Sequence, residues 1–148
     1  MSFCWDDEKI KKVEELYNRF RKIGVKLYFS YSTDGKYSTN VREKKEIPDE
    51  FFEKVFALCN KYNWGVHPML SYENIDQAIN NYNWWKKIIS KYPYLSYTPY
   101  PQLLEVRNPG WTEEKIKKYE EFLKYMLDDI FHNFCGSDPI MFFNNEIK

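Results

Sequence analysis

The sequence predicts an α/β fold in which helices and short strands alternate in the order α-β-α-β-α-β-α. Apolar residues recur at helical spacing in four segments, and three short apolar runs separate those segments. Helices between successive strands imply crossover connections and a parallel sheet. The chain has 148 residues, 43% of them hydrophobic, which suits one domain with a sizeable core. We therefore expect residues 1–148 to form a single domain, with helices flanking a small, three-stranded, mainly parallel sheet.

The first helix and the first strand are expected at residues 6–23 and 25–31. Two aspartates at the start of the helix can cap it, and Gly24 stands where a left-handed residue often ends a helix. One face of the helix carries Ile10, Val13, Leu16, Tyr17, Phe20 and Ile23. The strand runs into a Ser-Thr-Asp-Gly turn at 32–35 with no partner strand after it. A parallel strand, rather than one arm of a hairpin, is therefore expected.

The next two helices enclose the second strand. Pro48 and the two acids after it suit the first turn of a helix that ends near Tyr62. The second strand is expected at 64–70. Ser71 then serves as the expected N-cap of a third helix that ends near Ile89.

A third strand and a fourth helix complete the pattern. The strand is expected at 102–107, where Asn-Pro-Gly follows and ends it. The helix opens at Thr112 and stops before Gly136.

Polar side chains stand at the ends of all three strands. They are Ser30, Ser32, Thr33, Asp34, His67, Ser71, Glu105, Arg107 and Asn108. Ligands of parallel sheets bind at the carboxyl ends of the strands, so we expect these residues to form one rim. His67 is either a general base or a histidine bonded to loop backbone. Glu105 and Arg107 face the same side of their strand and form either an ion pair across strand ends or a substrate site.

Composition excludes several classes of function. Lys plus Arg and Asp plus Glu both number 22, which gives a nucleic-acid role no electrostatic support. Cys4, Cys59 and Cys135 are too far apart for a disulfide framework, as expected for a reducing cytoplasm. No apolar run is long enough to span a membrane, and the start has no signal-peptide pattern. We expect no metal site, because His132 and Cys135 alone cannot hold a structural zinc.

Aromatic residues make up 20% of the chain and supply candidate anchors for a protein partner. The candidates are Trp64, Trp84, Tyr94 and Tyr97. Trp84 precedes Trp85 on a helix, and adjacent helical residues point ~100° apart. Trp84 therefore either anchors a partner or covers a seam between helices. A sheet of three strands also has open edges, which other parts of the chain or a second copy in a homodimer must cover.

The three expected strand ends resemble radical S-adenosylmethionine (SAM) enzymes. FSYSTDG (29–35) is similar to the Ser-x-Asp-Gly strand midway through many of their partial barrels, and Arg42 in NVREK is similar to a downstream arginine of the family. WGVHPML (64–70) and LLEVRNPGWTEEKIKKYEEFL (103–123) resemble the strands that follow, as found in radical SAM proteins of phages and clostridia. The resemblance covers about residues 20–132 and implies the later half of a partial (βα)₆ barrel.

The sequence departs from this family where the iron–sulfur cluster would be held. The family binds a [4Fe–4S] cluster with a Cys-x₃-Cys-x₂-Cys loop, a spacing that this chain does not contain. By the resemblance, Ser32 and Arg42 match positions that contact the ribose and carboxylate of SAM. Without a cluster we expect no radical chemistry and no cofactor, and these two residues are either remnants or a residual SAM site.

We therefore expect a non-catalytic, protein-binding inhibitor derived from a truncated radical SAM enzyme. The resemblance to phage proteins suggests that a mobile element encodes it, and that it blocks a host defence nuclease such as a CRISPR effector, as an anti-CRISPR protein does. Two alternatives stay open. The chain is one half of a split radical SAM enzyme whose other half carries the cluster, or it binds SAM or another small ligand without chemistry.

Overall fold

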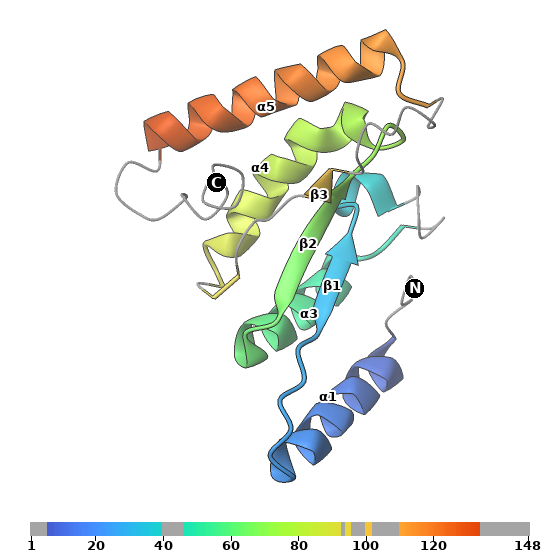
Figure 1. Ribbon diagram of the computed structural model, residues 1–148, viewed down its shortest axis with the longest axis vertical. Coiled ribbons are helices and arrows are strands. Elements are labelled where there is room, and N and C mark those ends of the chain that lie inside the picture. Colours follow the sequence, from blue (N-terminus) through green and yellow to red (C-terminus); the bar gives the residue numbers. More distant parts are fainter. Residues whose placement is uncertain (1–5, 40–45, 93, 96–99, 102–109, 134–148) are drawn as a thin grey trace.

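The computed structural model describes residues 6–39, 46–92, 94–95, 100–101 and 110–133. It has the mixed α/β architecture that the sequence predicts, and most of its regular structure is helical (Figure 1). The elements are α1 (Asp7–Lys22), β1 (Ser30–Thr33), the 3₁₀ turn η1 (Lys36–Ser38), α3 (Asp49–Tyr62), β2 (Gly65–Leu70), η2 (Ile75–Gln77), α4 (Ala78–Ile89), β3 (Tyr100–Pro101) and α5 (Glu113–Asn133). Within these described residues, no helix is both long enough and apolar enough to cross a bilayer.

The sheet is built on a parallel pair of strands. β1 pairs with β2 from Ser30 opposite Gly65 to Thr33 opposite Pro68. The two residues of β3 pair, also in parallel, with the last two residues of β2, so the strand order is β1-β2-β3. The third strand predicted at 102–107 lies outside the described residues.

The first strand begins later than predicted. Only Ser30–Thr33 pairs with a neighbour, and residues 25–29 make no ladder among the described residues. The predicted end of α1 is confirmed, because Gly24 has a φ of +79°. Its N–H donates to the carbonyl of Arg21 at 3.1 Å, and the N–H of Val25 donates to the carbonyl of Phe20 at 3.0 Å. These two bonds are the Schellman pattern that closes a helix C-terminus.

The predicted N-cap of the third helix is wrong. Ser71 does not cap α4, which begins at Ala78 after the 3₁₀ turn η2. Instead, Asn74 Oδ1 accepts a hydrogen bond from the backbone N–H of Ser71 at 2.8 Å, and the carbonyl of Ser71 accepts from the N–H of Ile75 at 3.0 Å. These bonds form a turn that delays the start of the helix.

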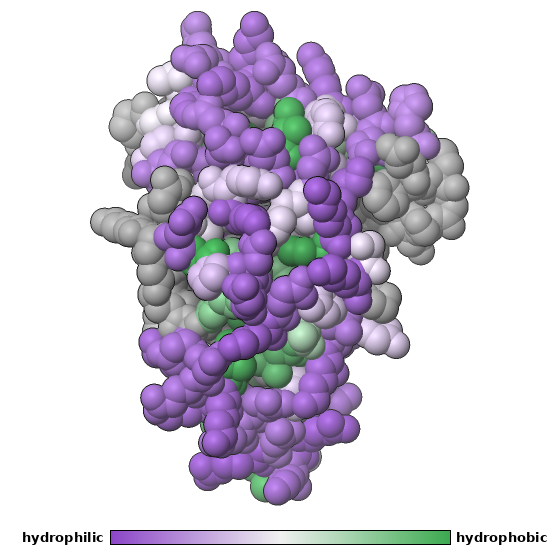
Figure 2. Space-filling model, turned by 180° about the vertical axis from the view of Figure 1, so that it is seen from behind, coloured by the Kyte–Doolittle hydropathy of each residue, from purple (hydrophilic) through white to green (hydrophobic). Residues whose placement is uncertain are grey.

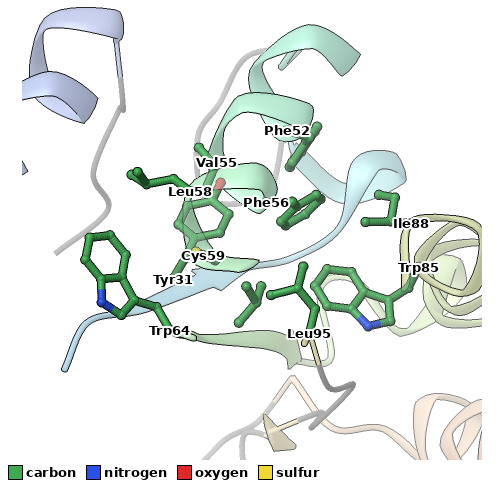
Figure 3. Close-up of a cluster of buried hydrophobic side chains, with 11 residues drawn as sticks. Tyr31, Phe52, Val55, Phe56, Leu58, Cys59, Trp64, Trp85, Ile88 and Leu95 are labelled. Atoms are coloured by element: carbon green, nitrogen blue, oxygen red, sulfur yellow. The ribbon is translucent and has the colours of Figure 1, made fainter. Parts of the chain in front are cut away.

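The core lies between one face of the sheet and the helices α3 and α4. Exposure alternates along both strands, so that Tyr31 and Val66 are buried while Ser30 and Ser32 are exposed. Figure 3 shows the aromatic and aliphatic side chains that fill this layer. Trp85 of α4 meets Phe56 of α3 edge to face, with ring centroids 5.1 Å apart. A second cluster, with Phe122 and Met126, joins α4 to α5.

Neighbouring helices run in the same direction. Lys54 pairs with Asp7 at 2.7 Å and Lys61 with Glu14 at 2.6 Å, and the equal separation of 47 residues requires α1 and α3 to be parallel. Along α4 and α5, Asn83 accepts from Tyr125 at 3.1 Å and Lys86 pairs with Asp129 at 2.6 Å, so these two helices are parallel as well. Parallel strands joined through parallel helices are the arrangement of successive βα units.

Candidate functional site

The carboxyl ends of β1 and β2 are joined by a hydrogen-bonded network of polar side chains, which we call the strand-end network. Its members are Thr33, Asp34, Ser38, Asn74 and Asn81. The amide of Asn74 donates to the carbonyl of Met69 at 2.9 Å and to Asp34 Oδ1 at 3.4 Å. The side chain is 2% exposed, so these bonds compensate for the burial of its amide group.

Asn81 of α4 forms the other half of the network. Its amide donates to the carbonyl of Asp34 at 3.1 Å and to Ser38 Oγ at 2.8 Å, and its Oδ1 accepts from the N–H of Tyr37 at 2.9 Å. Gly35 is required here, because its φ is +94° and an added Cβ would lie 2.4 Å from the Asn81 carboxamide. The loop after β1 is therefore fastened to α4 by bonds within the protein.

The expected rim is divided between two places. Asp34 belongs to the strand-end network, whereas Ser32 and His67 are paired residues on β1 and β2 and face away from α3. A Cβ added at Gly65 would lie 3.0 Å from His67 Nε2, so the imidazole lies over Gly65. Burial lowers the pKa of His67, which favours the neutral ring at neutral pH.

Several predicted site residues lie outside the described residues. They are Arg42, Tyr97, Glu105, Arg107 and Asn108. The predicted SAM contact of Arg42 and the ion pair of Glu105 with Arg107 therefore stay predictions.

The aromatic candidates occupy three different environments. Trp64 is 3% exposed and packs among Tyr17, Phe29 and Tyr62, so it is a core residue and the prediction of a surface anchor is wrong. Trp84 is half-buried and contacts Phe52, with ring centroids 4.9 Å apart. It therefore covers the seam between α3 and α4, which was the alternative to anchoring a partner. Tyr94 is 69% exposed and stands on the surface.

The side chains that could bind a metal ion are dispersed over the described part of the chain. Across that part, no three His, Cys, Asp or Glu side chains are grouped closely enough to hold a metal ion. Burial raises the pKa of the Cys59 thiol to about 12, so this cysteine remains protonated in the core. Cys4 and Cys135 lie outside the described residues.

An exposed apolar surface that the sequence did not predict runs from the end of α1 into the segment that leads to β1. We call it the α1–β1 edge and define it by four side chains. These are Leu16, Ile23, Val25 and Tyr28, which are 41%, 72%, 41% and 81% exposed. In the view of Figure 1, α1 lies below the start of β1, toward the side that faces away from β2. Figure 2 shows the opposite view, in which hydrophilic side chains cover both ends of the molecule and apolar side chains gather in the middle.

Two signals in the sequence could have identified these features. The α1 pattern places Leu16 and Ile23 on the apolar face, yet α1 contains no buried residue. Asn74 and Asn81 stand in a segment otherwise read as helix, where asparagine is disfavoured unless its side chain has another partner. Comparisons with protein-family models, curated proteins and solved structures gave no match for this chain.

Proposed function

We propose that this chain is a non-catalytic protein that acts by binding another polypeptide, and that the bound element is a β-strand added beside β1. One observation carries the proposal. The α1–β1 edge exposes Leu16 of α1 together with Ile23, Val25 and Tyr28 of the segment that leads into β1, a strand that has β2 on one side and no described strand on the other.

An edge strand offers backbone N–H and C=O groups that an added strand can pair with. Beside β1, the side chains of such a strand would meet Leu16, Ile23 and Tyr28 and remove their apolar surface from water. Exposure alternates from Lys26 to Thr33, so the chain that leads into β1 also has the side-chain alternation of a strand. Added pairing along that length would extend β1 toward the N-terminus.

The resemblance to radical SAM enzymes suggests how this edge arose. In a partial barrel, an earlier strand would stand beside β1, so the later half of such a barrel would expose this edge as a remnant. The proposed role as an inhibitor of a host defence nuclease follows from the resemblance to phage proteins, and the proposed partner is then the nuclease.

Photo-crosslinking tests the proposed surface. A benzoylphenylalanine placed at Tyr28 should crosslink to a partner in the native host, whereas the same group at Tyr94, also exposed, should not. Binding of the identified and purified partner should then be lost in Tyr28→Asp and kept in Tyr94→Asp. Crosslinks from position 94 alone, or equal binding by the two variants, would reject the α1–β1 edge as the docking surface.

The same edge supports a second candidate function, one half of a split radical SAM enzyme. Ser32 and His67 lie side by side on the sheet face that a barrel would enclose. The test is anaerobic co-expression with a polypeptide from the same genome that contains Cys-x₃-Cys-x₂-Cys. A stoichiometric complex with cluster absorbance and SAM cleavage supports this function, and separate elution of the two chains contradicts it. Binding of SAM by the isolated chain, measured by titration calorimetry, would instead favour a small-ligand-binding protein.

A further inference from the structure

The α1–β1 edge has a local charge that the whole chain does not have. The chain is neutral overall, with 22 basic and 22 acidic residues. From Leu16 to Thr33, however, the sequence contains four basic residues and no acidic one. The four are Arg19, Arg21, Lys22 and Lys26, and all are exposed.

Most lysines elsewhere in the described part of the chain form ion pairs, although Lys87, Lys117 and Lys124 do not. Lys54, Lys61 and Lys91 each form an ion pair at 2.6–2.7 Å with a carboxylate of a neighbouring element. None of the four at the edge forms an ion pair within the described part of the chain. Bases in the last turn of α1 stabilise the helix dipole, which accounts for part of the surplus. The helix dipole does not explain Lys26, which lies beyond the helix. It also does not explain why the apolar side chains between these bases are exposed.

We infer that the segment bound at the α1–β1 edge is an extended, alternately apolar strand with carboxylates at its ends. This inference rests on the proposed function and specifies the chemistry of the partner. The exposed Ile23, Val25 and Tyr28 would contact the apolar side chains of the strand. The carboxylates would neutralise Arg21, Lys22 and Lys26, and opposite charges would also steer the encounter.

A nucleic acid fits this surface less well than an acidic polypeptide. Phosphate backbones are bound by basic and polar groups, and aliphatic side chains such as Ile23 and Val25 add nothing to such contacts. The edge of β1 that faces away from β2 has no strand beside it among the described residues, and such an edge can also bind a polypeptide backbone.

Two fluorescent peptides provide the test. Both peptides contain a central segment of six residues in which valine and threonine alternate. The aspartate peptide has two aspartates at each end of this segment, and the lysine peptide has two lysines at each end. Fluorescence anisotropy with the whole chain should show that the aspartate peptide binds about tenfold more tightly at low salt, since each exposed charge pair contributes a modest amount. The difference should shrink as salt is added.

Charge reversal identifies which bases are responsible. The variant Arg21→Glu/Lys22→Glu/Lys26→Glu should prefer the lysine peptide. The control variant Lys87→Glu/Lys117→Glu/Lys124→Glu changes the net charge equally through exposed bases on α4 and α5, and should keep the original preference. Circular dichroism checks that both variants fold; if the first does not, Arg21→Gln/Lys22→Gln/Lys26→Gln should fold and bind both peptides equally.

The outcomes separate this inference from the proposed function. Equal binding of the two peptides, or the same loss of preference in both reversal variants, overturns the acidic partner and leaves strand addition standing. Absence of binding by either peptide overturns the inference as well, while the crosslink at Tyr28 still tests the docking surface. Binding of a single-stranded oligonucleotide, in competition with the aspartate peptide, would assign the bases to a nucleic acid instead.

Discussion

The helices α1 and α3 are similar in length and in pattern, yet their apolar faces have different environments. α3 has 14 residues and buries Phe52, Val55, Phe56, Leu58 and Cys59. α1 has 16 residues and carries five apolar side chains at helical spacing, none of which is fully buried, although Ile10, Val13 and Tyr17 pack in part against the core. An amphipathic pattern therefore indicates which face of a helix favours burial, but not how completely the rest of the chain covers that face.

The two helices are also held by different forces. The rings of Phe52 and Phe56 are stacked 5.8 Å apart and both meet Trp84. Ile10, Val13 and Tyr17 attach α1 to the core while only partly buried, and its ion pairs with α3, such as Lys61 with Glu14, are partly exposed and contribute little each. Its rings also contribute, since Tyr17 lies 4.5 Å from Tyr62 between centroids. We expect α1 to be the less stable of the two helices in the absence of a partner.

The largest expected effect comes from truncating the core side of this comparison. Phe56→Ala should lower the free energy of unfolding by about 3–5 kcal/mol, because Phe56 is fully buried and its loss leaves a cavity against Trp85. Phe20→Ala, at a half-buried position of α1, should cost about 1 kcal/mol. Urea denaturation measures both. Similar losses in the two variants would mean that α1 is packed as tightly as α3.

Two glycines allow a smaller and closely matched comparison. Gly24 and Gly35 both have positive φ, at +79° and +94°, but an added Cβ meets nothing within 4 Å at Gly24 and lies 2.4 Å from Asn81 at Gly35. Gly24→Ala should cost about 1 kcal/mol through backbone strain alone. Gly35→Ala should cost about 2–3 kcal/mol, because Asn81 must also move and break bonds of the strand-end network.

Thermal unfolding of the two alanine variants tests this difference. Asn81→Ala provides the control, since the extra cost at Gly35 should largely disappear in the double variant Gly35→Ala/Asn81→Ala. An equal cost at the two glycines would show that the loop after β1 adapts freely and that the network does not fix it.

Local signals in the sequence were sufficient for most of the helices and for the parallel pair of strands. Gly24 ends α1 as predicted, because a left-handed C′ residue depends on its own backbone conformation and on two neighbouring carbonyls. The start of α4 was not predictable in this way. Ser71 has the right chemistry for a cap, but Asn74 accepts a hydrogen bond from its backbone N–H and closes a turn ahead of the helix.

The candidate site was less predictable because its residues depend on contacts between distant segments. Asp34 was expected at a ligand-binding rim, and its partners Asn74 and Asn81 lie 40 and 47 residues further along the chain. Trp64 was expected at the surface because aromatic residues often anchor partners, whereas three rings from α1, α3 and the segment before β1 enclose it. Neither contact has a local signal in the sequence.

The smallest expected effect concerns the ion pair between α1 and α3. Lys61 and then Tyr62, which both donate hydrogen bonds to Glu14, hold the pKa of this carboxyl below its ordinary value. Because the pKa is lower in the folded state, the stability that Glu14 contributes is present above the unfolded-state pKa of about 4.5 and is lost as the pH falls through the folded-state pKa. Glu14→Gln should therefore lower the free energy of unfolding by about 0.5 kcal/mol at neutral pH, since the side chain is partly exposed.

The pH dependence distinguishes this pair from a general effect on α1. In urea denaturation, the difference between Glu14→Gln and the original chain should disappear once the pH lies below the folded-state pKa, where the carboxyl is protonated in both states. Glu8→Gln is the matched control, because Glu8 pairs with Lys12 within α1 and does not connect α1 to α3. A difference that persists at low pH would mean that Glu14 holds α1 through packing or a neutral hydrogen bond to Tyr62. The contact between α1 and α3 would then be as strong in acid as at neutral pH. That result would contradict an electrostatic contribution of Glu14 to this contact.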